Sequence, residues 1–317
     1  MTGETEFPEI RVAIYGPGQL GTSVRDILQH RPGINVGEFG GRERRQRVLE
    51  SGADVVLICT TSFLHDVAND VRAALSAGSN VIVSAEEAAY PWATDAMLAA
   101  ELDELAKTRA VTIVGGGINP GFAFDWLVLA GASATSRVDR IRVGRIVDLS
   151  GFGATVLSRI GVGYLPDEFD SGVAAGTITG HIGFPQSMNV VGRHLGVSIE
   201  RIDRRIAPIF SQQGYDLRAG RIEAGRSAGF EQLYRAYVDG QVWFEAVFTG
   251  HIDPLAIGRP PRDEISIEGD PPLHYVVDPG FKAQSGSASL MANSVRRVVA
   301  ARPGWITVGE LPPALPI

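Results

Sequence analysis

Two adjacent carboxylates, Glu86 and Glu87, come just after the apolar run 80–83. Such a run predicts a buried strand, so the pair falls at the carboxyl end of a strand, where open α/β sheets bind their ligands. Neighbouring carboxylates in a partly apolar cleft repel each other and lose solvation, and both effects raise the pKa toward the value that a general base needs. The alternative is that both are solvated acids in the first turn of a short helix, where the helix dipole favours them.

A glycine-rich loop near the start of the chain has the spacing G-x-G-x-x-G, formed by Gly16, Gly18 and Gly21 with Gln19 and Leu20 between them. It follows a β-branched apolar run and opens a helical pattern. In that context the glycines permit a tight turn, the approach of a pyrophosphate to the backbone and close packing of helix on strand. The loop therefore predicts a dinucleotide site; the alternative is a turn that binds nothing.

The end of the next strand bears on the choice of dinucleotide. NAD-binding chains usually carry an acidic residue there for the ribose hydroxyls. Here Gly41 stands near that place, and Arg42 follows as the first of three clustered arginines. A missing carboxylate with guanidinium groups nearby suits a 2′-phosphate, so we expect NADP to be preferred over NAD. Glu38 would bind the ribose of NAD if the strand ended earlier. The other two arginines, Arg44 and Arg45, also fit the solvated start of a helix.

Two further loops fall at the carboxyl ends of predicted strands. One contains Thr60, Thr61 and Ser62, and the other, 115–122, places Asn119 and Pro120 after three glycines. Because ligands bind at this edge of a parallel sheet, we expect these five residues to contact the cofactor. The second loop also fits a simple turn between domains.

The elements that position these residues follow from the hydrophobic pattern. From residue 9 to about 115, apolar runs alternate with helical patterns, which predicts an N-terminal Rossmann domain (1–138) with a doubly wound parallel sheet. Residues 139–285 predict an α+β domain with a largely antiparallel sheet, because Asp239 and Gly240 separate two alternating segments as in a hairpin. An amphipathic helix within about 286–317, ended by Pro303 and Gly304, is expected to pack back on the first domain.

Composition excludes several classes of partner. Acidic residues outnumber basic ones by 36 to 29, for a net charge of −7, which argues against nucleic acid and anionic membranes. The single cysteine, Cys59, lies in an apolar run, so we expect a reduced thiol and a cytoplasmic protein. No apolar stretch is long enough for a membrane span or a signal peptide. The six histidines have no metal-ligand spacing, and no bound metal is expected.

Several longer blocks carry a resemblance to a known family. The stretches VIVSAEEAAYP (81–91), GGGINPGFAFD (115–125), DLSGFGATVLSRIGVGY (148–164) and GHIGFPQSM (180–188) resemble the 2,4-diaminopentanoate dehydrogenase family, which includes native NAD(P)-dependent amine dehydrogenases. The resemblance extends to the tail GWITVGELPPA (304–314) and covers nearly the whole chain. It implies a second domain similar to that of dihydrodipicolinate reductase, and a homodimer built through this domain.

The implied activity is reversible oxidative deamination of a primary amine to a carbonyl compound and ammonia, with a glutamate of the AEE block as catalytic carboxylate. A carboxylate suits this chemistry because it can hold the ammonium group, accept its proton and later activate water. Neighbouring side chains of an extended segment point to opposite faces, so we expect only one of the two glutamates to reach the substrate, and we prefer Glu86.

By the same resemblance, the substrate side is expected to include residues from two of these blocks: Phe152 near the nicotinamide, Tyr164, His181, Phe184, Gln186 and Asn189. Taken singly, each fits ordinary packing as well. Asp125 and Trp126 are expected to pack and cap rather than to catalyse. The segment 273–290 departs from the glycine-rich pattern of the family, and no residue stands out in the sequence as an anchor for an amino-acid head group. A smaller or more apolar amine or ketone is therefore the alternative substrate.

Two other functions remain alternatives. One is a reductase of the dihydrodipicolinate reductase-like group that reduces a preformed imine or carbonyl without free ammonia, although the AEE block stands where a basic proton donor would be expected. The other is a regulatory protein that binds NADP(H) and catalyses nothing. Dependence of cofactor oxidation on ammonium separates the first from an amine dehydrogenase, and cofactor binding without turnover identifies the second.

Overall fold

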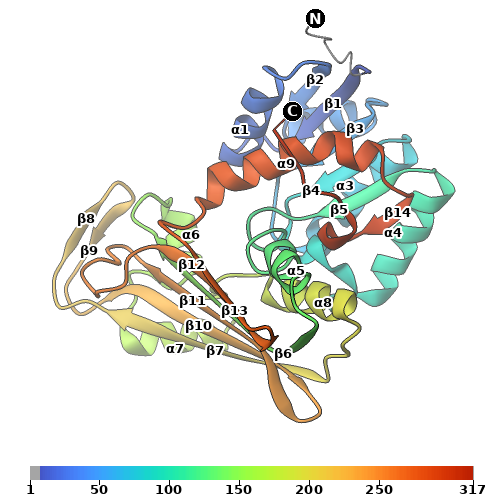
Figure 1. Cartoon of the computed structure of the whole chain (residues 1–317). Coiled ribbons are helices and arrows are strands. Elements are labelled where there is room, and N and C mark those ends of the chain that lie inside the picture. Colours follow the sequence, from blue (N-terminus) through green and yellow to red (C-terminus); the bar gives the residue numbers. More distant parts are fainter. Residues whose placement is uncertain (1–7, 317) are drawn as a thin grey trace, which may run out of the picture. The chain divides into compact units, whose positions relative to one another are not determined.

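The structure, a computed structural model, describes residues 8–316 (Figure 1). Its contacts divide the chain into two compact units. Of the described residues, unit 1 comprises 8–127, 189–194 and 282–316, and unit 2 comprises 128–188 and 195–281. Unit 1 is thus assembled from three separate segments of the chain. In the described part, no helix is both long and apolar enough to cross a membrane.

Unit 1 is built on a parallel sheet with the strand order β14-β5-β4-β3-β1-β2. The strands are β1 (Ile10–Tyr15), β2 (Ile34–Gly40), β3 (Val55–Ile58), β4 (Asn80–Val83), β5 (Thr112–Gly115) and β14 (Gly304–Ile306). The principal helices are α1 (Gln19–Leu28), α2 (Arg45–Leu49), α3 (Leu64–Ser76), α4 (Ala96–Thr108) and α9 (Ala283–Val299). The predicted doubly wound domain is confirmed. After β2 the chain forms a 3-10 turn, η1 (Arg42–Arg44), and the short helix α2 follows directly.

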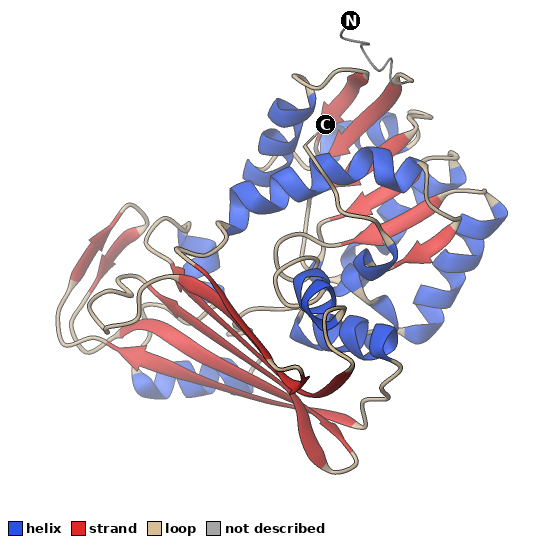
Figure 2. Cartoon of the chain, in the orientation of Figure 1, coloured by secondary structure: helices blue, strands red, loops and turns tan. Residues whose placement is uncertain are grey.

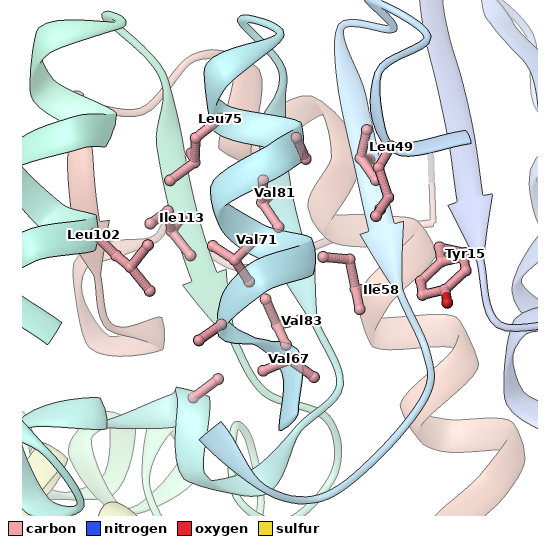
Figure 3. Packing of buried hydrophobic residues seen from close by; sticks show 14 of the residues in the cluster. Tyr15, Leu49, Ile58, Val67, Val71, Leu75, Val81, Val83, Leu102 and Ile113 are labelled. Atoms are coloured by element: carbon pink, nitrogen blue, oxygen red, sulfur yellow. The ribbon is translucent and has the colours of Figure 1, made fainter. Parts of the chain in front are cut away.

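Strand alternation gives this sheet two apolar faces, each covered by helices (Figure 2). On one face α2, α3 and α4 pack on the sheet; Figure 3 shows Val67, Val71 and Leu75 of α3 beside Val81 and Val83 of β4. On the other face, α1 and α9 pack on each other and on the sheet. The helix α9, near the end of the chain, therefore covers a sheet whose first five strands all come before residue 116 in the sequence.

Unit 2 contains a second six-stranded sheet with the order β13-β12-β6-β11-β10-β7. Every neighbouring pair is antiparallel except β6 with β11, as the sequence predicts for a largely antiparallel sheet. The hairpin signal is confirmed: Asp239 and Gly240 both have positive φ, 49° and 71°, and join the two strands β10 and β11. The strands are β6 (Arg137–Asp148), β7 (Arg201–Phe210), β10 (Ser227–Val238), β11 (Gln241–His251), β12 (Arg262–Asp270) and β13 (Leu273–Val277).

Shorter elements complete the chain. A small hairpin joins β8 (Tyr215–Leu217) to β9 (Gly220–Ile222). The helix α5 (Trp126–Ala132) follows the loop after β5. Between β6 and β7 the chain forms three helices, α6 (Ala154–Arg159), α7 (Pro166–Ala174) and α8 (Phe184–Leu195). Three further 3-10 turns are η2 (Glu86–Ala89), η3 (Pro91–Ala93) and η4 (Val308–Glu310).

Candidate active site

The turn between β1 and α1 explains all three glycines of the fingerprint. Gly16 has φ +114°, and a Cβ on it would lie 2.2 Å from the carbonyl oxygen of Cys59. A Cβ on Gly21 would lie 1.9 Å from the carbonyl oxygen of Gly16. A Cβ on Gly18, in contrast, would meet nothing within 4 Å. Two glycines are thus required by the turn itself, whereas the middle one keeps open the space into which a pyrophosphate would fit.

A cavity of about 830 Å³ opens beside this turn. Its lining includes Gly16, Gly18, Gly41, Arg42, Thr60 and Thr61, all predicted to bind the cofactor. The other predicted cofactor residues, Gln19, Leu20, Gly21, Ser62, Asn119 and Pro120, do not line this cavity. The turn after β1 and the ends of β2 and β3 therefore meet around one space, as the carboxyl ends of parallel strands must.

The arginines after β2 have separate roles. Arg44 and Arg47 both pair with Glu38, each at 2.7 Å, and Arg45 pairs with Asp70 at 2.6 Å. Arg42 lines the cavity and has no ion pair within residues 8–316. Both carboxylate oxygens of Glu38 are therefore engaged, so the alternative of a Glu38–ribose contact loses support, while Arg42 keeps a cation available to a ligand.

An acidic side chain lies beside Arg42. The carboxylate of Glu43 accepts the N–H of Gly41 at 3.1 Å, and hydrogen bonds from its own backbone N–H and that of Gly41 lower the pKa of Glu43. Cys59 is buried and also lines the cavity, and burial raises the pKa of its thiol to about 12, so the sulfur is a neutral thiol near pH 7. The cavity lining thus contains one cation, Arg42, and three carboxylates, those of Glu43, Asp66 and Asp70.

The two adjacent glutamates begin the 3-10 turn η2, which is separated from the end of β4 by two residues. Glu87 Oε2 accepts the backbone N–H of Leu64 at 2.7 Å, and its own N–H donates to the carbonyl of Ser62 at 3.3 Å. Leu64 is the first residue of α3, whose N-cap, Phe63, supplies no side-chain acceptor. Glu87 therefore caps a helix that begins 23 positions earlier in the chain. Glu86 is the other carboxylate at this strand end.

The loop after β5 packs directly against η2. A Cβ on Gly115 would lie 2.2 Å from the backbone of Ala88, so only glycine permits this approach. In the same loop, Asp125 is fully buried and accepts the N–H groups of Gly121 and Trp126 at 2.6 and 2.8 Å. The expectation that Asp125 caps and packs agrees with these contacts.

Asn119 in this loop has an unusual environment. Both polar atoms of its side-chain amide are buried without a hydrogen-bond partner in the described part of the chain. A buried amide of this kind costs free energy unless a ligand satisfies it. It lies after β5, the region where a nicotinamide would be expected, and a carboxamide has the complementary donor and acceptor. With the fingerprint turn and Arg42, the residues present fit a nicotinamide dinucleotide.

Sequence reasoning missed an apolar cavity of about 290 Å³ in unit 1. It is lined by glycines of the β5 loop, by Leu290 and Met291 of α9, and by the tail segment 311–315. Phe122 and Trp126 also line it, with ring centroids 5.6 Å apart and nearly parallel planes. No charged residue lines it. The tail and α9 reach this place only through the fold, so no local pattern marks the cavity.

In unit 2, two of the predicted substrate residues lie together in an aromatic cluster. The ring of His181 lies 5.2 Å from that of Phe184 and 4.8 Å from that of Phe248, while Phe184 stacks on Tyr234 at 5.0 Å. The backbone N–H of His181 donates to Gln232 Oε1 at 2.8 Å. Burial, together with nearby positive charge, lowers the pKa of His181 to about 3, so its imidazole is neutral near pH 7.

The remaining predicted substrate residues lie apart from this cluster or pack differently. The Tyr164 hydroxyl is 2.7 Å from Ser158 Oγ. Phe152 is half-buried in the turn before α6, Gln186 is 4% exposed in α8, and Asn189 belongs to unit 1 by its contacts. Phe184 is itself 1% exposed, which favours the packing interpretation for its ring.

Known proteins resemble this chain over nearly its full length. Residues 122–316 match the family model of the 2,4-diaminopentanoate dehydrogenase C-terminal domain. A 2,4-diaminopentanoate dehydrogenase from Acetoanaerobium sticklandii is 31% identical over 330 residues, which cover 96% of this chain and 94% of the relative. The chain belongs to the 2,4-diaminopentanoate dehydrogenase family. As a member, it is an NAD(P)-dependent oxidoreductase that acts on CH–NH₂ groups, and the predicted family and enzyme class are confirmed.

Solved structures support the fold. An amine dehydrogenase from Mycobacterium smegmatis superposes with a TM-score of 0.84 at 23% identity and covers 98% of both chains. GenD2 from gentamicin A biosynthesis, solved with NAD, gives a TM-score of 0.55 at 15% identity, covering 98% of this chain and 92% of its own. Biliverdin reductase from Synechocystis sp. PCC 6803, solved with NADP+, gives 0.53 at 13%, covering 94% and 93%. The fold is thus one that holds nicotinamide dinucleotides of both kinds.

Proposed function

We propose that this family member catalyses reversible oxidative deamination of a primary amine to a ketone or aldehyde and ammonia, with Glu86 as its general base. The observation that supports this assignment is the contact between Glu87 Oε2 and the Leu64 N–H. Glu87 therefore has a structural role, the capping of α3, which it would have to give up in order to exchange protons with a substrate. Of the two carboxylates at this strand end, Glu86 is the one that we assign to proton transfer.

The carboxylate accounts for each proton in the reaction. In the oxidative direction, Glu86 binds the substrate ammonium and accepts one of its protons, which makes the C–H bond hydridic enough to be broken. A nicotinamide held at the end of β5 would supply the acceptor for that hydride. After hydride transfer Glu86 releases its proton to solvent and deprotonates the water that attacks the iminium carbon. It passes this second proton to the nitrogen of the carbinolamine, and it takes the hydroxyl proton as ammonia leaves and the carbonyl forms. A negative carboxylate stabilises the cationic iminium, which a lysine in the same place would oppose.

We further propose NADP as the preferred cofactor and Arg42 as the residue that binds its 2′-phosphate. Arg42 lines the cavity beside the fingerprint turn, while the three arginines that follow it are paired with Glu38 and Asp70. Arg42→Ala should reduce kcat/KM for NADPH by about 10- to 100-fold and change that for NADH little. Equal losses with both cofactors would contradict this role. Asn119 and Pro120 are proposed for the nicotinamide end, and Gln19, Leu20 and Ser62 for the walls of the dinucleotide site.

Unit 2 is proposed to supply the substrate residues and the interface of a homodimer. On one face of its sheet, the apolar side chains of Leu233 and Val247 lie among ion pairs. The carboxylate of Glu245 on this face is only 7% exposed and pairs with Arg235 at 2.8 Å and with Arg142 at 3.3 Å. Light scattering should give a dimer mass, and Val247→Arg should yield monomers. A wild-type monomer would refute the interface.

We also propose that the protein is cytoplasmic, because its buried thiol is neutral and the proposed substrates are small molecules.

The test of the activity measures NADPH and NADH oxidation with a panel of ketones, aldehydes and keto acids, with and without ammonium. Glu86→Gln and Glu87→Gln form a matched pair, because each removes one charge from the same turn. We expect ammonium-dependent oxidation that Glu86→Gln lowers by about 1,000-fold or more and Glu87→Gln largely retains. Oxidation that proceeds equally without ammonium would instead identify a carbonyl or imine reductase, and binding without turnover would identify a sensor.

A further inference from the structure

The apolar cavity of unit 1 is large enough to hold a small molecule. Its volume is about 290 Å³, whereas an engineered protein cavity of about 150 Å³ already admits one benzene ring. Protein interiors are packed as densely as organic crystals, so a space of this size is costly to leave empty. Every residue that lines it belongs to unit 1, and none of them lines the cavity beside the fingerprint turn. The two cavities are therefore separate sites.

Few polar groups on the wall of this cavity are left for a ligand. The N–H groups of Gly116, Gly117 and Gly121 all donate to other residues of unit 1, at 3.0, 2.7 and 2.6 Å. Ser294 carries the one hydroxyl among the lining residues, and its Oγ donates to the carbonyl of Leu290 at 2.7 Å. A buried water molecule needs several polar partners, so this wall favours an apolar occupant over water.

The side chains of the wall favour an aromatic occupant. The rings of Phe122 and Trp126 line the cavity together, and aromatic rings stack on one another or meet edge to face. Trp126 also brings an indole N–H, the one side-chain donor of the wall that is not engaged with a described residue. Met291 on the opposite wall has a flexible side chain that adapts to ligands of irregular shape.

The tail segment 312–316 lines the cavity and is held by few contacts. Its one hydrogen bond within the described residues runs from Arg297 Nε to the carbonyl of Pro313, at 3.2 Å. Three of its five residues are prolines, which have no N–H to donate. Leu315 lines the cavity although it is 49% exposed. A chain end held in this way can move aside and admit a ligand.

We propose that this cavity binds a small, uncharged, apolar molecule of about one to two aromatic rings, which enters beneath the tail segment. The site is distinct from the cofactor and amine sites, because no charged residue lines it that could bind a phosphate, a carboxylate or an ammonium group. One wall is the β5 loop, which also carries Asn119, so a bound molecule would stabilise the loop that we assign to the nicotinamide end. The competing explanation is that the tail folds inward and fills the space.

The experiment uses toluene as the probe, with benzyl alcohol and benzoate as comparators that add a hydroxyl group and a charge. Calorimetric titration and thermal unfolding of the full chain measure binding. At about ten times its dissociation constant, toluene should raise the Tm by about 3 °C. Benzyl alcohol should bind about tenfold more weakly or worse, and benzoate should not bind.

A matched pair of variants locates the site. Ser294→Leu places a larger side chain in the cavity and should weaken toluene binding by about tenfold or more. Ser285→Leu is the control, because it makes the same change at an exposed position of α9 and should leave toluene binding unchanged.

Several results would overturn the proposal. Toluene that does not bind the wild type would show that the tail fills the cavity. Equal binding of all three compounds, or equal effects of Ser294→Leu and Ser285→Leu, would show that toluene binds elsewhere. If Ser294→Leu does not fold, crystals of the wild type exposed to bromobenzene vapour decide: anomalous scattering from bromine beside Leu290 and Trp126 supports the site, and its absence there refutes it. Amine turnover is not measured in any of these experiments, so their outcome is independent of the proposed activity.

Discussion

The capping role of Glu87 gives a sharp prediction about stability. Glu87→Ala removes the acceptor for the Leu64 N–H, and Leu64 is fully buried at the first turn of the thirteen-residue helix α3. Loss of a helix cap costs roughly 1 kcal/mol, and loss of a negative charge at a helix N-terminus adds about 0.3–1 kcal/mol. The buried N–H is left without a partner, which raises the total to about 2 kcal/mol.

Urea and thermal unfolding of the purified variants measure this cost. For a unit of this size, 2 kcal/mol corresponds to a decrease in Tm of about 4–8 °C. Glu87→Gln should lose about half as much, because the amide oxygen still accepts the hydrogen bond but carries no charge. Glu104→Ala, at an exposed position of α4, controls for the general effect of losing a glutamate and should change the Tm little. A Glu87→Ala variant with wild-type stability and no activity would refute the reasoning and move the catalytic role to Glu87.

Three further predictions concern other parts of the molecule. Gly18→Ala should leave the Tm nearly unchanged but weaken cofactor binding at least tenfold in a fluorescence titration. Gly21→Ala should unfold at a clearly lower temperature, because its Cβ would lie 1.9 Å from a carbonyl oxygen. The pKa of His181 is lowered from 6.5 to about 3, so the folded state binds fewer protons than the unfolded state between these values. The free energy of unfolding that the neutral imidazole contributes above pH 6.5 is therefore lost as the pH falls. The loss between about pH 7.5 and about pH 5 is up to about 2 kcal/mol. Urea unfolding at these two pH values should show a smaller loss for His181→Gln than for the wild type. Arg145→Met should cost roughly 3–5 kcal/mol in urea unfolding by leaving Asp263 buried and unpaired, and combining it with Asp263→Leu should recover most of that loss.

The parts of the fold that the sequence predicted are those with strong local signals. The fingerprint glycines stand within six residues of one another, and the turn at Asp239 and Gly240 depends only on its own backbone. Hydrophobic periodicity marked the longer strands and helices of unit 1, which extend over enough residues for the pattern to repeat. The three residues of β14 are too few for a period, and prolines interrupt the segment that contains β12 and β13.

The parts of the candidate site that the sequence could not resolve depend on distant partners. Our proposal of Glu86 rather than Glu87 rests on the Leu64 N–H, and our proposal of Arg42 rests on the partners of its neighbours, such as Asp70, 25 positions from Arg45. Such contacts arise from tertiary packing and leave no pattern in the chain.

The last segments of the chain, α9 and β14, pack on the first sheet, and this affects how the protein folds while it is being translated. Thr112 Oγ1 at the start of β5 donates to the carbonyl of Arg302, 190 positions later, and the buried indole of Trp305 donates to the carbonyl of Ala88 in η2. A ribosome releases these last segments only after all of unit 2 has emerged. Until then the nascent first sheet lacks β14 and the cover of α9, so a growing chain presents one apolar face that a chaperone would have to shield.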